Sequence, residues 1–256
     1  MVVALAALLV ATALIAVLSL SRQSPPPTAD DAAAQDQKPQ EQTAPAQAGP
    51  GTANAAEPGV DQLQLTWPQG RPLRVFFSGD SLTAGEFSTT EDTSFRRLVT
   101  AQVRQRGPVE EVGTYKSGYR LQEIASGFAI PQGAGLAVVE LGTNDLAANT
   151  DNALFARQYK DYLNRVVAAS PDAKLLCLGV WAPAAAGRTT ALDAAITAGC
   201  QAHGGQFISL KELFDAPANR GPAGAPVWLG TRDTFHPNDA GHAAIADAVL
   251  QRIASS

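Results

Sequence analysis

The sequence predicts an α/β protein, a three-layer α/β/α sandwich built around a five-stranded, mostly parallel sheet. Apolar runs of strand length alternate with longer segments in which apolar residues recur at helical spacing, and this alternation is typical of βαβ units. Residues 65–256 are also numerous enough for one domain with a sizeable core. We therefore expect helices on both faces of the sheet and right-handed connections between the strands.

Each expected element has its own signal in the chain. Strands are expected at the short apolar runs, residues 73–78, 109–115, 136–141, 174–180 and 206–210. Helices are expected where the period lengthens, at residues 94–105, 152–169, 189–203 and 238–254. In the second of these helices, large apolar residues recur at helical spacing and should form its buried stripe: Phe155, Tyr159, Tyr162, Leu163 and Val166.

The first part of the chain differs in composition from the rest. Residues 1–20 are almost all apolar and carry no charged side chain, and a membrane-spanning helix needs about this length. Residues 1–21 are therefore interpreted either as a cleaved secretion signal or as an uncleaved membrane anchor. Residues 22–64 are rich in Pro, Ala and Gln, and such a composition predicts a disordered tether. The domain, residues 65–256, is thus expected outside the cytoplasm, secreted or tethered to the membrane by residues 1–20.

Charge and aromatic content restrict the partners. The formal net charge is -5, and no block of Lys or Arg occurs that would suit nucleic acid or an anionic membrane surface. Aromatic residues make up only 6% of the chain and are not interleaved with basic ones, as a groove for single-stranded nucleic acid requires. We expect a small, uncharged or mildly polar substrate, no nucleic-acid partner, and membrane contact only through the N-terminal segment.

The two cysteines, Cys177 and Cys200, allow two interpretations. In an exported protein they could form one disulfide, or they could be two buried thiols, and their spacing does not decide between these. His203 follows Cys200 by three positions, but no second close pair of ligands accompanies it. The pattern is therefore not that of a zinc site, and no metal is expected.

A serine and a histidine have the placement that nucleophilic catalysis needs. Ser81 directly follows the first expected strand, and open α/β sheets carry their chemistry at such strand ends. A serine hydroxyl needs a base, and the base needs a third group that fixes its tautomer. His203 and His242 fall at the end of or inside expected helices, whereas His236 lies in a loop three residues after Asp233. The alternative is a turn that only caps the last helix.

Two further strand ends offer donors for a developing oxyanion. Asn144 follows the third expected strand, and its amide could point across the sheet edge toward Ser81. Gly118 follows the second strand, where a glycine lets a backbone N–H approach a ligand closely. Each residue also has a structural interpretation, because Asn144 could cap the next helix and Gly118 could only turn the chain.

Taken together, these residues resemble a known family. From about Arg71 to the C terminus the chain resembles the GDSL family of esterases and lipases, also called SGNH hydrolases. Four motifs carry the resemblance, in the order of the family: Gly79-Asp80-Ser81-Leu82, Gly118, Gly142-Thr143-Asn144-Asp145 and Asp233-Thr234-Phe235-His236-Pro237. The pair Thr234-Phe235 departs from a frequent pattern at positions that vary in character.

The resemblance implies a role for each matching residue. Ser81 would be the nucleophile, and its own N–H would form the oxyanion hole with the Gly118 N–H and the Asn144 amide. His236 would act as general base and then as general acid, held by Asp233.

Asp80 and Asp145 also match the family pattern and would brace the loops rather than react. The resemblance implies no metal and no organic cofactor.

The expected function is hydrolysis of carboxylic esters through an acyl-enzyme. Acetyl or other short acyl esters are the expected substrates, with cell-envelope or extracellular polysaccharide as a candidate carrier of the ester. One alternative is an acyltransferase that uses the same residues and passes the acyl group to a sugar hydroxyl. Another is a non-catalytic carbohydrate-binding module that has kept the fold.

Overall fold

The sheet confirms the predicted fold class. The computed structural model describes residues 61–254, and these contain a five-stranded sheet in the order β2-β1-β3-β4-β5. All neighbouring strands in it are parallel. The strands are β1 (Leu73–Gly79), β2 (Val109–Tyr115), β3 (Leu136–Glu140), β4 (Lys174–Leu178) and β5 (Gln206–Ile208).

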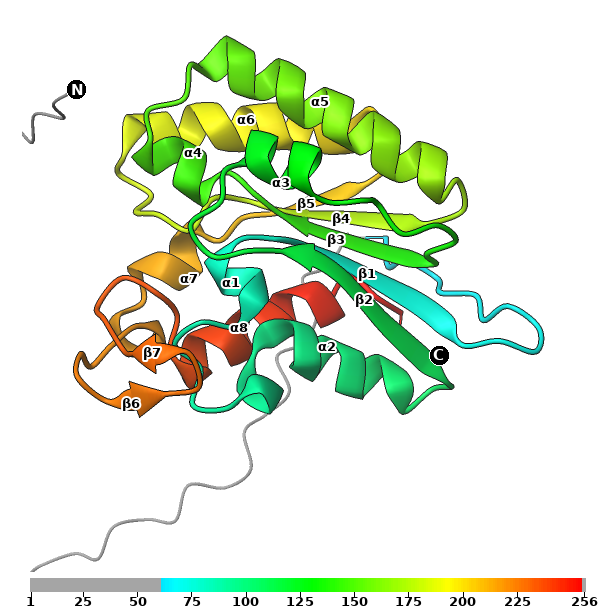
Figure 1. The fold of residues 1–256 in the computed structure, drawn as a ribbon, viewed down its shortest axis with the longest axis horizontal. Coiled ribbons are helices and arrows are strands. Elements are labelled where there is room, and N and C mark those ends of the chain that lie inside the picture. Colours follow the sequence, from blue (N-terminus) through cyan, green and yellow to red (C-terminus); the bar gives the residue numbers. More distant parts are fainter. Residues whose placement is uncertain (1–60, 255–256) are drawn as a thin grey trace, which may run out of the picture. The chain divides into compact units, whose positions relative to one another are not determined.

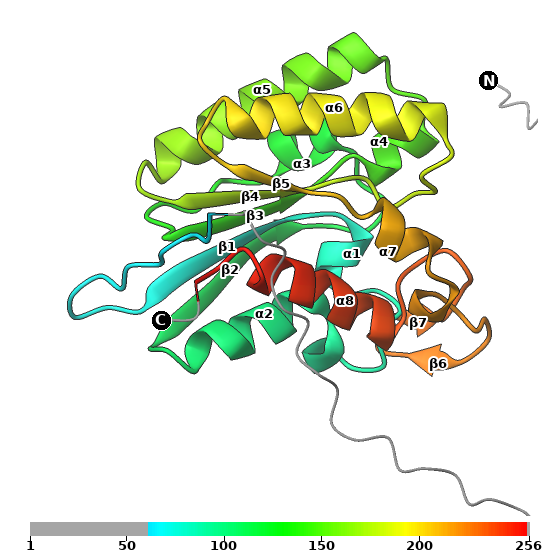
Figure 2. The same ribbon diagram turned by 180° about the vertical axis from the view of Figure 1, so that it is seen from behind.

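Helices cover both faces of this sheet, as Figures 1 and 2 show. The longer ones lie within a few residues of their expected ranges: α2 (Phe95–Arg104), α5 (Asn152–Ala169), α6 (Gly187–Gln201) and α8 (Asp239–Leu250). The sequence does not predict the shorter ones: α1 (Ser81–Ala84), α3 (Leu121–Gly127), α4 (Thr143–Ala147) and α7 (Lys211–Asp215). Two turns of 3₁₀-helix (Glu91–Thr93 and Pro217–Asn219) and a small antiparallel hairpin, β6 (Pro226–Val227) and β7 (Gly230–Thr231), complete the domain.

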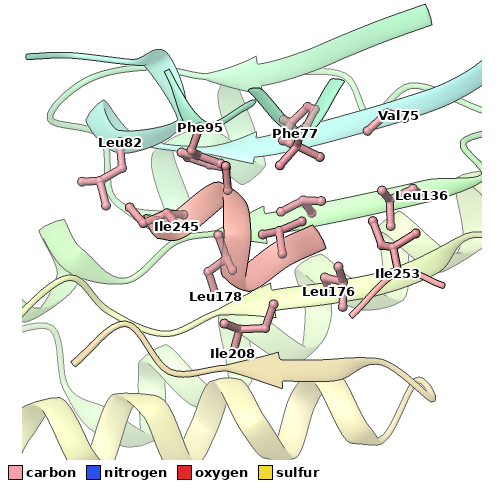
Figure 3. Packing of buried hydrophobic residues seen from close by; sticks show 14 of the residues in the cluster. Val75, Phe77, Leu82, Phe95, Leu136, Leu176, Leu178, Ile208, Ile245 and Ile253 are labelled. Atoms are coloured by element: carbon pink, nitrogen blue, oxygen red, sulfur yellow. The ribbon is translucent and has the colours of Figure 1, made fainter. Parts of the chain in front are cut away.

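The two faces of β1 contribute to two separate cores because successive side chains of a strand point to opposite sides. Val75 and Phe77 belong to the same core as residues of α2 and α8, and Figure 3 shows Phe77 near Phe95. Phe76 packs on the other face, in a core that α3, α5 and α6 cover. Burial of one such large apolar side chain stabilises the fold by about 1.5–3 kcal/mol. β1 is therefore packed on both faces, and Ser81 follows its C-terminal residue, Gly79, by two positions.

The long helix α5 packs as its period predicts. All five residues of the expected stripe are buried, namely Phe155, Tyr159, Tyr162, Leu163 and Val166. The Tyr162 hydroxyl also forms a 2.5 Å hydrogen bond with Ser78 Oγ on β1, which ties the helix to the strand that leads to Ser81.

Cys177 and Cys200 form a disulfide that joins β4 to α6. Their Cα atoms are 6.1 Å apart, within the range that a disulfide spans. The bridge closes a loop with a sequence separation of 23 residues, and a loop of this size stabilises the fold by about 3 kcal/mol in the chain-entropy account. Of the two interpretations that the sequence leaves open, the structure has the disulfide.

The folded domain begins slightly earlier than residue 65. Leu63, which we expected in the tether, forms a parallel β-bridge with Ile253 and packs against the core. Its N–H donates to Arg252 O at 2.7 Å, and its carbonyl accepts from the Ala254 N–H at 3.1 Å. Residues 1–21 and most of the expected tether lie outside the described residues. Within residues 61–254, no helix has the length and apolar character to cross a membrane.

Candidate active site

The residues that the sequence singles out gather at the C-terminal edge of the sheet. Ser81 opens α1 directly after β1, Gly118 follows β2, Asn144 lies in α4 after β3, and His236 lies between β7 and α8. Figures 1 and 2 both place α1, α4 and the β6–β7 hairpin at this one end of the sheet. Parallel topology thus brings together residues that are far apart in the chain.

Tight backbone packing places Ser81 at the start of α1. The Asp80 carboxylate caps the helix by accepting a hydrogen bond from the Leu82 N–H at 3.2 Å. A Cβ atom on Gly79 would lie 1.9 Å from Thr83 Oγ1 and 2.7 Å from the Glu140 carbonyl oxygen, so only glycine permits this turn. The glycine of the Gly-Asp-Ser-Leu motif therefore has a steric reason.

Ser81, His236 and Asp233 form a continuous hydrogen-bonded chain. Ser81 Oγ lies 3.1 Å from His236 Nε2, and His236 Nδ1 lies 2.8 Å from Asp233 Oδ2. Because a carboxylate only accepts hydrogen bonds, it favours the tautomer with the proton on Nδ1. The lone pair of Nε2 is then free to accept the proton of the serine hydroxyl.

The loop around Asp233 keeps this carboxyl group ionised. Its Oδ1 accepts the backbone N–H groups of Phe235 at 2.9 Å and His236 at 2.8 Å. Partial burial acts to raise the pKa of Asp233, but the hydrogen bonds from His236 and Phe235 outweigh it and lower the pKa below its ordinary value. Asp233 is therefore the anion that orients the His236 ring.

Two aromatic rings fix the plane of the imidazole. Phe87 stacks on His236 with ring centroids 4.2 Å apart and an interplanar angle of 17°. Phe235 meets the same ring edge-on at 5.1 Å and 89°. Phe87 has φ 68°, a left-handed conformation that is unfavourable for this residue type, so the surrounding contacts must hold it there.

His242 supports the loop that carries Phe87. It is fully buried, its Nδ1 accepts the Phe95 N–H at 3.3 Å, and its Nε2 donates to Glu86 O at 3.0 Å. The Glu86 N–H in turn donates to Ser81 O at 3.0 Å. Sequence reasoning places His242 in the last helix and misses this role, because nothing local to α8 indicates the contact.

The buried His242 should make stability depend on pH. Burial lowers the pKa of His242 to about 4, below its ordinary 6.5, so between these values the unfolded chain binds more protons than the folded one. The free energy of unfolding should therefore fall by up to about 3 kcal/mol as the pH drops from 6.5 to 4. His242→Gln removes this term, and urea unfolding across this pH range should show a shallower decline in the variant.

Carboxyl groups whose pKa is raised in the folded domain have the opposite effect on the free energy of unfolding as the pH drops. The wild type and His242→Gln both contain these groups, so their effect cancels when the two proteins are compared. An equally steep decline in His242→Gln would show that the histidine is not the titrating group.

Gly118 and Asn144, the expected oxyanion donors besides Ser81, follow the ends of β2 and β3. Gly118 has φ 76°, which favours glycine, and a Cβ atom there would have no heavy atom within 4 Å. Asn144 Nδ2 donates to Asp80 Oδ2 at 3.0 Å and to Tyr119 O at 3.1 Å. The structure thus brings the Asn144 amide to the carboxylate of Asp80, the residue before Ser81. That Asn144 donates a hydrogen bond to an oxyanion stays a prediction.

Asp145 and Asp80 occupy different surroundings. Asp145 Oδ2 accepts a hydrogen bond from the Leu121 N–H at 2.8 Å at the start of α3, and its Oδ1 accepts one from Thr150 Oγ1 at 2.9 Å, so this carboxylate links α3 to the end of α4.

Asp80 is fully buried, and its burial raises the pKa to about 6. Beside it lies a buried acid that the sequence analysis missed, Glu140. The sequence did contain a sign of this buried acid, since Glu140 is the one charged residue in the apolar run of β3.

The described residues offer no group of three or more His, Cys, Asp or Glu side chains that could hold a metal ion.

One protein family matches the sequence. The model of the GDSL-like Lipase/Acylhydrolase family matches residues 77–244, which is more than half of the chain. No curated protein matches the sequence.

Similar solved structures are esterases and lipases of low sequence identity. A variant of an acetyl-xylooligosaccharide esterase from Geobacillus has a TM-score of 0.55 and 15% identity, over 72% of this chain and 95% of that one. Phospholipase A1 from Streptomyces albidoflavus has a TM-score of 0.53 and 15% identity, over 71% and 100%. A carbohydrate esterase family 2 enzyme from Myceliophthora fergusii has a TM-score of 0.52 and 16% identity, over 73% of this chain and 66% of that one, slightly less than two thirds of its length. At these identities the likeness establishes the fold.

Proposed function

Because the chain belongs to the GDSL-like lipase/acylhydrolase family and is a carboxylic-ester hydrolase, we propose that it cleaves acetyl or other short acyl esters through an acyl-enzyme on Ser81. The observation that carries this proposal is the chain of contacts from Asp233 through His236 to the serine hydroxyl. It supplies the nucleophile, the base and the group that orients the base.

The proposed reaction proceeds in two halves. Ser81 Oγ attacks the acyl carbon as His236 Nε2 takes its proton. The negative oxygen of the tetrahedral intermediate accepts hydrogen bonds from the Ser81 and Gly118 N–H groups and from the Asn144 amide, which releases one of its two present acceptors to make this bond. His236 then gives the proton to the leaving alcohol, and the acyl group stays on the serine. Water, deprotonated by His236, attacks the acyl-enzyme, and the carboxylic acid leaves as Ser81 regains its proton.

Exposed apolar side chains near the nucleophile favour a substrate with a small apolar or sugar-like surface. Trp228, Leu229 and Phe235 are among the few large apolar residues that are exposed in the described domain. Phe235 contacts the His236 ring, and the Trp228 ring would lie 3.6 Å from a Cβ atom on Gly85, at the end of α1. Aromatic faces of this kind suit acetylated sugars, and two of the similar structures are of carbohydrate esterases by their descriptions.

A series of p-nitrophenyl esters tests the acyl specificity. We expect kcat/KM to be highest for acyl chains of about two to four carbons and acetate to be released from an acetylated polysaccharide. A preference for long chains, or no acetate release, would contradict the proposed substrate class. Product analysis with an added sugar acceptor separates hydrolysis from acyl transfer, since both share the first half of the reaction.

We also propose that the domain works outside the cytoplasm, secreted or held at the membrane by residues 1–21. The uncharged apolar run at residues 1–20 supports this location. A disulfide between Cys177 and Cys200 is typical of oxidising compartments and supports it independently.

A further inference from the structure

We propose that Glu140 is a positioning residue for ester hydrolysis, a buried neutral acid that holds Asp80 in place beneath the nucleophile. This inference rests on the proposed function. Glu140 ends β3, directly opposite Gly79 of β1, and is fully buried. Neither the proposed triad nor the expected oxyanion donors include it.

The contacts of Glu140 run to the turn that presents Ser81. Its Oε2 accepts Thr83 Oγ1 at 2.9 Å and faces the Asp80 N–H at 3.4 Å. Its Oε1 is buried and has no hydrogen-bond partner among the described residues. An ionised carboxylate would be costly in such a place, whereas a neutral acid avoids most of this cost.

Asp80 connects Glu140 to the reacting groups. Its Oδ1 accepts the Leu82 N–H at 3.2 Å and lies 3.5 Å from Ser81 Oγ, while its Oδ2 accepts Asn144 Nδ2 at 3.0 Å. A displacement of this carboxylate would therefore move both the serine turn and the expected oxyanion donor.

One of the two carboxyl groups should be neutral, because two adjacent buried carboxylates do not both ionise. Burial raises the pKa of both groups, and the charge of Asp80 raises that of Glu140 further. The hydrogen bond from the Leu82 N–H lowers the pKa of Asp80, and the pKa of Glu140 is raised well above its ordinary value, so Asp80 is the charged member of the pair.

Few other titratable or charged groups face the pair. His236 faces Asp80 from the loop before α8, Tyr159 faces Glu140 from α5, and Arg96 from α2 donates to Thr83 O at 2.9 Å.

Two substitutions of nearly equal shape separate hydrogen bonding from packing. Glu140→Gln keeps a side-chain oxygen that can accept from Thr83 Oγ1 and from the Asp80 N–H, whereas Glu140→Met removes this acceptor. We expect Glu140→Gln to keep kcat for p-nitrophenyl acetate within about threefold of the wild type. Glu140→Met should lose at least tenfold in kcat with KM within about threefold, because the loss of one oxyanion donor costs about 10²–10³. Thr100→Val is the control for the loss of a buried polar group in the core. Thr100 lies buried in α2, and its Oγ1 has no hydrogen-bond partner among the described residues.

The pH profile gives a readout that a change in packing alone would not move. Since the polar side chain of Glu140 beside Asp80 acts to lower the pKa of Asp80, its replacement in Glu140→Met should move the acid limb of kcat/KM to higher pH. The limb should stay in place in Glu140→Gln and Thr100→Val. Wild-type kcat and an unmoved acid limb in Glu140→Met would overturn the inference, as would an equal loss in Glu140→Gln.

If Glu140→Met does not fold, Glu140→Asp decides, because it keeps the acid but withdraws it by one methylene. It should lose at least tenfold in kcat, and wild-type kcat in this variant would overturn the inference.

Wild-type turnover of the ester is measured first. If the wild type is inactive, the proposed function fails, whereas an active wild type with fully active Glu140 variants refutes the positioning role alone.

Discussion

Replacement of Ser81 with alanine is expected to lower kcat for an acetyl ester by a factor of about 10⁴ or more, because the acyl group then has no oxygen to which it can be transferred. The residual rate would come from binding and from the oxyanion donors alone. Steady-state kinetics on p-nitrophenyl acetate give this ratio directly, and circular dichroism shows that the variant is folded.

Ser126→Ala is the matched control for this substitution. Ser126 is exposed, and its hydroxyl donates to Gln122 O within α3, away from the triad. Its kcat should equal that of the wild type. A Ser81→Ala variant that keeps more than a tenth of wild-type kcat would rule out Ser81 as the nucleophile.

Asp233→Asn is expected to lower kcat by about 10²–10⁴ while KM changes little. Asn has the same shape, but its amide can donate to His236 Nδ1 and so favour the wrong tautomer, with the proton on Nε2 facing Ser81. The charge that stabilises the imidazolium in the transition state is also lost. The side chain of Asp233 is 41% exposed, so water can replace part of the interaction, and the lower part of the range applies if it does.

Asp151→Asn makes the same chemical change away from the site. Asp151 caps α5 by accepting the Leu154 N–H at 2.9 Å, and Asn caps helices equally well. This control should keep wild-type kcat. Equal activity of Asp233→Asn and the wild type would exclude the carboxylate from orienting the base.

The fold was predictable from the sequence because most of its elements are long and periodic. The stripe of α5 follows from its helical period, and β1 follows from an apolar run that is buried on both faces, and both agree with the structure. The shorter helices were not predictable. α4, for example, has only five residues, too few to show a helical period in the sequence.

The site was predictable where local spacing carries the chemistry. Asp233 precedes His236 by three residues, and this spacing allows the contact of 2.8 Å between them. Glu140 and His242 were missed because each acts through buried contacts with distant segments. His242 is separated by 156 residues from the Glu86 carbonyl that it supports. The disulfide was left open for the same reason, since the sequence contains no measure of the distance between β4 and α6.

The most direct test of the account is the reaction of the protein with a fluorophosphonate, which forms a covalent bond only with an activated serine. We predict one modification per chain, located on Ser81 by peptide mass spectrometry, with no labelling of Ser81→Ala and slow labelling of Asp233→Asn. An unmodified wild-type protein that still hydrolyses acetyl esters, or a modification on another residue, would contradict the claim that His236 activates Ser81.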